Sequence, residues 1–314
     1  TLSLRRYHRK IHCSKGGNDV RKNKISGVLI NLYFILSSLL FIIPFVLIIS
    51  ASFTDEQTLL QEGYKLIPTK FSVEAYKYVF RSPQQLLDSY KITIIYSAIA
   101  TVLGVVVMAM MAYPLSRPNY RYKRIVTFFI FFTMLFSGGL IPTYIWVTRY
   151  LHLGDTIWVY ILPCLVNAFH IIVIRTFFQG LPPSLVESAK IDGARELQIF
   201  FKIVIPLSKP VIATIALLTL LARWNDWNTA LIYIKSKELY SLQYLLQKIL
   251  REAQFVKDMA DSTPIAGLDL DLSKLPSETI RFAMCLVAAG PMLVVFPFFQ
   301  KYFAKGLTVG AVKG

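Results

Sequence analysis

One short stretch of the sequence holds four side chains of the kinds that bind carbohydrate: Trp224, Asn225, Trp227 and Asn228. Indole faces can stack on sugar rings, and asparagine amides can donate to and accept from hydroxyl groups. Asn167 and His170 form a second polar pair, one helical turn apart. We predict that the four residues and Asn167 line a substrate pathway. Two other interpretations stay open, namely an aromatic belt at a membrane interface and a bond from the Asn167 pair to a neighbouring helix.

A polar, helix-prone insert at 187–206 separates two apolar stretches. Just ahead of it, Ser184 and Glu187 have the spacing of a capping box, which predicts that a helix begins there after two prolines. Gly193 can adopt the positive φ that ends a short helix, and a second helix is expected from about 194 to 204. Such a protrusion can seat in a second protein and carry rigid-body motion into the apolar stretches.

The second helix of the insert carries apolar side chains that are predicted to contact this second protein. They are Phe200, Phe201 and Ile203, with Arg195 and Lys202 at the rim. The alternative is an amphipathic helix that rests on lipid.

The sequence lacks patterns for catalysis or metal binding. It contains neither a Gly-x-x-x-x-Gly-Lys-Ser/Thr loop, which cradles ATP phosphates, nor His-Glu-x-x-His. Cys13, Cys164 and Cys285 have no close spacing, so neither a disulfide framework nor a metal site is indicated. We predict no catalytic residue, no metal and no cofactor of the chain's own.

Composition places the chain in a membrane. With 55% hydrophobic and 17% charged residues among 314, it has too little polar surface for a soluble globule of this size. Six apolar stretches are long enough to cross about 30 Å of hydrocarbon as helices. The prediction is an all-α membrane protein with spans near 28–50, 92–115, 125–147, 157–174, 203–222 and 282–300.

The net charge of +16 is explained by topology rather than by nucleic acid. If the N-terminus is cytoplasmic, the inside segments carry 20 of the 34 Lys and Arg and only four acids, whereas the outside segments carry 14 of each. This positive-inside pattern predicts that both termini are cytoplasmic.

Two large external segments are expected, at 51–91 and 225–280. In the second, one helical stripe is apolar and is predicted to pack on the spans or on the membrane surface. Beyond it, 258–277 is acidic and turn-rich, as in a protruding loop. The stripe comprises Leu242, Leu245, Leu246, Ile249 and Leu250, and the loop includes Ser262, Thr263, Pro264 and Gly267.

The third apolar stretch contains Gly138, Gly139 and Pro142. These residues weaken helical hydrogen bonding, so they predict either a break that lines a pathway or close helix packing through small side chains.

The insert resembles the Glu-Ala-Ala loop of the permease subunits of binding-protein-dependent ATP-binding-cassette importers. Maltose-type and polysaccharide-type sugar permeases are also similar over nearly the whole chain beyond the first 25 residues. The likeness rests on Glu187, Ala189, Asp192, Gly193, Ala194, Ile203, Ile205 and Pro206, with Ser188 in place of the usual alanine, and on 112–117, 137–142, 224–227 and 300–314.

This resemblance implies a type I importer permease fold, with a cytoplasmic coupling helix between the fourth and fifth spans. The implied partners are a second homologous permease, two ATPase subunits that use ATP and Mg, an extracytoplasmic sugar-binding protein and the lipid bilayer of a bacterial cell membrane. The loop at 258–277 would contact the binding protein. The ATPase-coupling residues would be Glu187, Ala189, Asp192, Gly193, Ala194, Phe200, Ile203 and Pro206.

The expected organisation is a basic cytoplasmic tail at 1–27, a permease domain at 28–303 with the coupling loop at 182–204, and a cytoplasmic tail at 304–314. An ion-coupled secondary carrier for a small polar solute is the alternative function. Such carriers place acids near the membrane midplane, and the six predicted spans contain no Asp or Glu.

Overall fold

The computed structural model describes residues 16–262 and 277–311. In these ranges the chain is helical, apart from one isolated β-bridge between Thr54 and Phe71. The predicted all-α class is confirmed. Of the predicted binding-protein contacts, Thr263, Pro264 and Gly267 lie outside the described residues.

Three helices are each long and apolar enough to cross a membrane without interruption. They coincide with the first, second and sixth predicted spans. They are α2 (Gly16–Ser52), α5 (Pro83–Ser116) and α16 (Ser277–Ala311).

The other three predicted spans are bent pairs, so six spans result only if each pair counts as one. The break near 125–147 is one of the two interpretations of its sequence, whereas the breaks near 157–174 and 203–222 are not predicted. The pairs are α6 (Lys123–Leu135) with α7 (Leu140–Ile145) and a π-helical turn to Tyr150, bent by 113°; α8 (Trp158–Ile161) with α9 (Ala168–Gln179), bent by 51°; and α11 (Glu196–Ile199) and α12 (Ile205–Leu207) with α13 (Lys209–Trp224), bent by 82°.

The first break follows from glycine. Gly139 has φ of +86°, a conformation that other residues rarely adopt, and α7 begins directly after it. A Cβ built on Gly139 would meet no atom within 4 Å, so close packing at this residue is not what requires a glycine. Of the two interpretations of this stretch, the structure has the break in the helix.

The second break lies against α5. A Cβ on Gly104 would come within 3.0 Å of the Leu165 carbonyl oxygen, so only a glycine lets the broken segment approach this closely. The backbone N–H of Asn167 donates to the Met108 sulfur at 3.4 Å.

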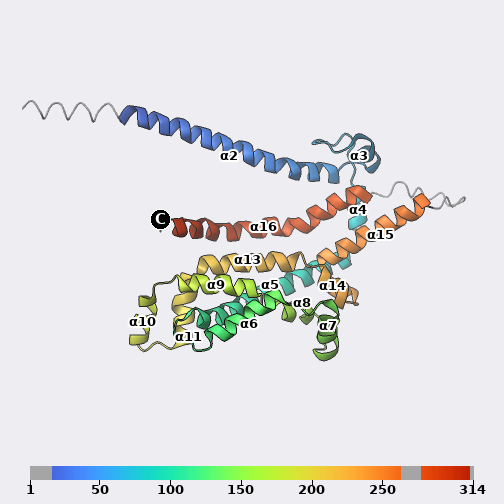
Figure 1. Ribbon diagram of the computed structural model, residues 1–314. Helices are drawn as coiled ribbons and strands as arrows, with labels where there is room; N and C mark the ends of the chain where they lie inside the picture. Colours follow the sequence, from blue (N-terminus) through green and yellow to red (C-terminus); the bar gives the residue numbers. More distant parts are fainter. Residues whose placement is uncertain (1–15, 263–276, 312–314) are drawn as a thin grey trace, which may run out of the picture.

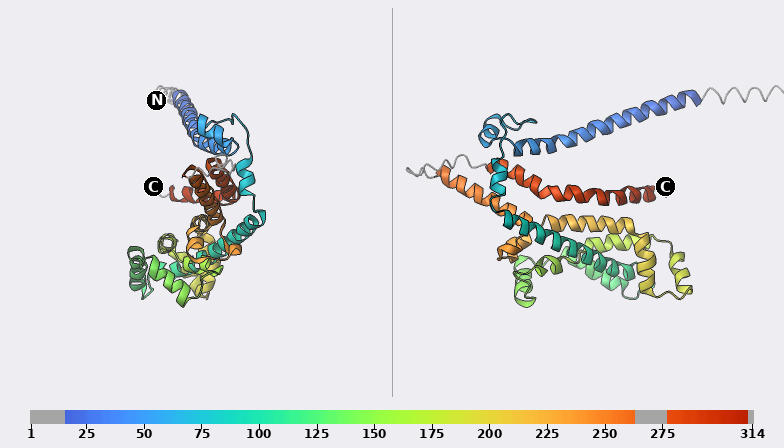
Figure 2. Two further views of the ribbon diagram at one scale, coloured as in Figure 1. Left: turned by 90° about the vertical axis from the view of Figure 1, so that its right-hand side faces the viewer. Right: turned by 180° about the vertical axis from the view of Figure 1, so that it is seen from behind.

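The helices place two groups of short elements at opposite ends of the molecule (Figures 1 and 2). At one end lie α10 (Pro183–Ile191) and α11, together with the first residues of α2 and the last residues of α16. At the other end lie α3 (Glu56–Glu62), α4 (Glu74–Val79), α7, α14 (Asn228–Tyr233) and α15 (Leu242–Ser262).

The apolar stripe predicted for α15 is confirmed. Leu242, Leu245 and Leu246 are buried, and Ile249 and Leu250 pack against the same core, which includes residues of α4, α5, α13 and α16. The stripe therefore packs on the spans.

Glu56 holds the beginning of α16. Its carboxylate accepts hydrogen bonds from the backbone N–H groups of Glu278 and Thr279 and from the Thr279 hydroxyl, all at 2.8 Å. The first amides of a helix have no partner within the helix and favour a negative charge. Glu56 is buried, so this contact anchors the beginning of α16 to α3.

We expect Glu56→Ala to lower the free energy of unfolding by about 2 kcal/mol, because it leaves buried donors without their acceptor. The measurement is thermal unfolding of the purified chain in detergent. Glu62→Ala, in the same helix, removes exposed contacts to Lys65 and Thr69 and should have little effect. Equal losses in the two variants would contradict the anchoring role of Glu56.

Candidate functional site

The polar insert folds into two helices joined by a turn in which one residue has a positive φ. We call residues 183–204 the elbow. Gly193 has φ of +76°, and the N–H of Ala194 donates across the turn to the Ala189 carbonyl at 2.9 Å. Val186 and Ala189 on α10 are buried, as is Ile199 on α11. The predicted helix, glycine turn and helix are confirmed.

The predicted capping box at Ser184 and Glu187 is wrong. The first helix begins at Pro183, and its N-cap makes no side-chain hydrogen bond. Proline suits the first position of a helix because its φ is already helical and its missing N–H needs no partner. A side chain that bonds back to the N-cap residue of its own helix occurs in the second helix instead. There the Gln198 side-chain oxygen accepts from the Arg195 N–H at 2.9 Å.

The prediction that Phe200 is an exposed knob is also wrong. Phe200 is 3% exposed and belongs to the core, and Ile203 packs against that core. Phe201 is exposed as predicted. The most exposed apolar side chain of the elbow is Ile191 at 86%, next to the turn, and Leu197 is also exposed.

The elbow ends in a π-helical turn, Phe200–Val204, just before Pro206. Proline has no N–H and its ring crowds the carbonyl four residues earlier, which disfavours an ordinary α-helical turn at this point. The Ile205 N–H donates to the Phe200 carbonyl. The chain then bends by 82° at Ser208 into α13.

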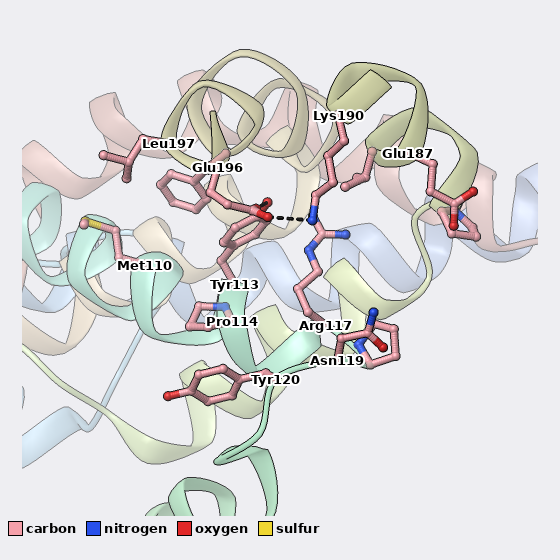
Figure 3. A pocket seen from close by; sticks show the side chains of 14 residues that line it. Met110, Tyr113, Pro114, Arg117, Asn119, Tyr120, Glu187, Lys190, Glu196 and Leu197 are labelled. Atoms are coloured by element: carbon pink, nitrogen blue, oxygen red, sulfur yellow. Dashed lines mark hydrogen bonds and ion pairs between the residues drawn. The ribbon is translucent and has the colours of Figure 1, made fainter. Parts of the chain in front are cut away.

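A carboxylate joins the two helices of the elbow to the end of α5, as Figure 3 shows. Glu196 accepts a hydrogen bond from the Tyr113 hydroxyl at 2.7 Å and pairs with the Lys190 ammonium at 2.6 Å. The Arg117 guanidinium lies over the Tyr113 ring at 4.4 Å. We call the contacts of Tyr113, Lys190 and Glu196 the latch.

A cavity of about 620 Å³ lies between the elbow and the end of α5. Tyr113, Arg117, Lys190 and Glu196 line it, with apolar side chains such as Met110 around them. The elbow therefore contacts α5 at the latch and through the Phe200 ring, which lies 5.2 Å from the Tyr113 ring, and the cavity lies beside these contacts.

The predicted coupling residues occupy both faces of the elbow. Some form its packing surface and others its outer surface. Ala189 and Phe200 are buried, Ala194 and Ile203 are half-buried, and Glu187, Asp192, Gly193 and Pro206 are exposed.

At the opposite end of the molecule, Trp224 does not line an open pathway, and this part of the carbohydrate prediction is wrong. Trp224 is 3% exposed, and its indole N–H donates to the Ala288 carbonyl of α16 at 3.0 Å. Leu217, seven positions earlier, is buried as well. That spacing puts both residues on one helix face and is a signal that Trp224 packs in the core.

The remaining predicted pathway residues stay at the surface. Asn225 donates to the Leu221 carbonyl at 2.9 Å, which satisfies the end of α13, and Asn228 is exposed. Trp227 is exposed beneath the Arg251 guanidinium, which lies 5.7 Å from the ring centroid. Asn167 caps α9 by accepting the His170 N–H at 3.1 Å, so this pair bonds within its own helix.

Asp155 is a residue that sequence reasoning missed. It has φ of +56°, and its carboxylate accepts from the N–H groups of Lys235 and Ser236, both at 2.9 Å, and from the Ser236 hydroxyl at 2.7 Å. The Ser236 bonds, followed by the Lys235 N–H, hold the pKa of Asp155 below its ordinary value. The ionised Asp155 carboxylate therefore stabilises the fold at pH values above its ordinary pKa. This stabilisation is lost only as the pH falls through the lowered pKa.

Within 16–262 and 277–311, no group of three or more His, Cys, Asp or Glu side chains is placed to hold a metal ion. Ser262, the first of the predicted binding-protein contacts, is the last residue of α15.

Comparisons with known proteins agree with one another. The family model described as binding-protein-dependent transport system inner membrane component matches residues 20–309. The polygalacturonan/rhamnogalacturonan transport system permease protein YtcP of Bacillus subtilis is 39% identical, over 93% of this chain and 100% of that protein. Protein LplC of the same organism is 41% identical, over 87% and 90%.

A solved structure is similar as well. It is the crystal structure of a bacterial ABC transporter involved in the import of the acidic polysaccharide alginate, matched with a TM-score of 0.68 and 30% identity over 90% of this chain and 98% of that chain.

We expect Tyr113→Phe to lower the free energy of unfolding by about 1 kcal/mol, because it removes a hydrogen bond to a partly exposed charged acceptor. Thermal unfolding in detergent measures the loss. Tyr120→Phe is the matched control, since the Tyr120 hydroxyl points away from the elbow in Figure 3. The latch is refuted if Tyr113→Phe is no less stable than Tyr120→Phe.

Proposed function

The chain belongs to the family of binding-protein-dependent transport system inner membrane components, and we propose that it forms half of the pathway of an ATP-driven importer for a sugar or oligosaccharide. The observation that carries this proposal is the full-length similarity to a permease named for polygalacturonan and rhamnogalacturonan transport. As a member of this family the chain is a transport subunit and not an enzyme, with the type I importer permease fold expected from the sequence.

In the proposed mechanism the elbow is the coupling helix. ATP binding would close a pair of ATPase subunits and move the elbow inward as a rigid body, and the spans would then open toward a loaded binding protein. The glycine turn, the buried faces of both elbow helices and the latch support rigid motion. Ile191, Leu197 and Phe201 offer the apolar surface that an ATPase cleft would cover.

The proposed partners are a second homologous permease, two ATPase subunits and an extracytoplasmic sugar-binding protein. ATP and Mg would be used by the ATPase subunits, because no nucleotide loop occurs in this sequence. The exposed apolar surface of α2 supports a lipid or protein environment for that helix, since no residue from 27 to 49 is buried within the chain.

We propose that both termini are cytoplasmic and that the chain lies in the bacterial cell membrane. The proposed organisation keeps the tails at 1–27 and 304–314, the permease domain at 28–303, the coupling loop at 182–204 and the external segments at 51–91 and 225–280. The elbow lies at the same end as the first residues of α2 and the last residues of α16, which supports this topology.

The positions of the acidic residues fit an ion-coupled carrier less well than an ATP-driven importer. Within the helices that could span a membrane, the acids lie near helix ends: Asp88 in the second turn of α5, Glu196 in the elbow and Glu278 at the start of α16. A carrier needs an acid nearer the midplane to bind its coupling ion.

Replacing Gly193 by Leu should uncouple ATP hydrolysis from uptake while the subunits still insert. The turn needs φ of +76°, and a Cβ would meet no atom within 4 Å, so the cost comes from backbone conformation and not from a clash. Sugar-stimulated ATP hydrolysis and uptake in reconstituted vesicles are the measurements. Gly193→Asn is the control, because asparagine tolerates positive φ. Normal uptake by the Leu variant would count against the mechanism.

Deletion of 258–277 should reduce stimulation by the binding protein more than basal ATP hydrolysis, because this loop is proposed to contact that protein. The comparison is made on the reconstituted complex with and without the binding protein. Equal loss of both activities would mean that the loop serves folding instead.

A further inference from the structure

Two hollows lie side by side at the end of the molecule opposite the elbow. One, of about 210 Å³, lies between Trp227 and a face of α15. The other, of about 250 Å³, lies between the beginning of α5 and α15. Lys248 and Glu252 line both hollows, so the two adjoin along α15, and together we call them the basic groove.

The charge of this groove is one-sided. Four of the lining residues are basic, Arg81, Lys237, Lys248 and Arg251, and one is acidic, Glu252. The predicted external segments as a whole carry 14 bases and 14 acids, so the excess is local to the groove. Arg81 comes from the first external segment and the other three bases from the second, so folding brings them together.

The cations remain available to a ligand. Arg251 lies over the Trp227 ring at 5.7 Å and Lys248 over the Tyr240 ring at 5.2 Å. Arg251 has no ion pair among the described residues, and Lys248 reaches Glu252 only at 3.9 Å. Cation–π contacts hold such groups in position without using up their hydrogen-bond donors.

The groove also has surfaces that suit sugar rings. Trp227, Tyr244 and Phe255 line the first hollow with Gln247, and Tyr78, Ser82 and Gln85 line the second. Aromatic faces stack on the apolar side of a sugar ring, whereas amides and hydroxyls bond to its hydroxyl groups.

We propose that the basic groove binds an acidic oligosaccharide, with its carboxylates at Arg81, Lys248 and Arg251 and a ring against Trp227. This inference rests on the proposed function and deepens it by naming the substrate class, which is a chain of uronate sugars. Two hollows that adjoin at Lys248 suit successive rings of one chain. The groove would receive the oligosaccharide before it enters the spans.

The test uses the complete transporter in lipid nanodiscs, without the binding protein. The probes are tetragalacturonate and the neutral maltotetraose, and the affinity of each is measured at low and high salt. We expect tetragalacturonate to bind more tightly and to weaken with salt, because exposed charges are screened. Arg251→Gln should weaken its binding about tenfold, as expected for loss of a charge-assisted hydrogen bond.

Arg149→Gln is the matched control, since Arg149 is exposed in the π-helical turn at Trp146–Tyr150 and lies outside the groove. Equal affinity for the two oligosaccharides, or equal effects of the two variants, would overturn the proposal. So would an Arg251→Gln variant that keeps its tetragalacturonate affinity but loses stimulation by the binding protein, because the groove would then be a protein-docking surface. Failure of the proposed function itself has a different signature, namely no ATP-dependent uptake of any oligosaccharide by the wild-type complex.

Discussion

Helix α5 supplies the polar partners that the interrupted helices lack. A break inside an apolar segment leaves backbone groups that cannot turn to water, so each must find a partner within the protein. The Tyr96 hydroxyl donates to the Arg223 carbonyl at 3.0 Å, where α13 ends, and Thr93 accepts the Leu242 N–H at 2.9 Å, where α15 begins. Near the middle, Gly104 admits the Leu165 carbonyl, and Met108 accepts from Asn167. Without α5 the bent helices and the start of α15 would lose these contacts.

The same helix reaches from the elbow to the basic groove. Tyr113, in the last turn of α5, carries the latch, and Gln85, in the first, lines the groove. At 34 residues α5 is about 50 Å long, and no break interrupts it between these two positions. A displacement of the elbow would therefore be transmitted along one continuous helix. The bent helices, by contrast, can change their angles at 136–139, 165–167 and Ser208, where the α-helical hydrogen bonding is already interrupted.

Sequence reasoning succeeded where a local pattern determines the structure. The apolar stretches located the spans, Gly193 located the turn of the elbow, and spacing at i, i+3 and i+4 identified the buried stripe of α15. It failed where a residue far away in the sequence determines how a side chain packs or bonds. Phe200 lies in a polar segment, which predicts an exposed side chain, yet the rings of Tyr113 and Phe200 lie 5.2 Å apart inside the core. Glu56 and Thr279 are 223 positions apart, and no short-range pattern reports their hydrogen bond.

The basic residues of the chain have two separate explanations. Those of the predicted inside segments follow the positive-inside pattern, which concerns insertion and needs no particular arrangement in space. Arg81, Lys237, Lys248 and Arg251 lie at the opposite end of the molecule, where that pattern predicts no excess of positive charge. Like charges gathered on one surface repel one another and cost stability unless a ligand or partner neutralises them. A requirement for an anion at this surface accounts for their gathering, whereas topology does not.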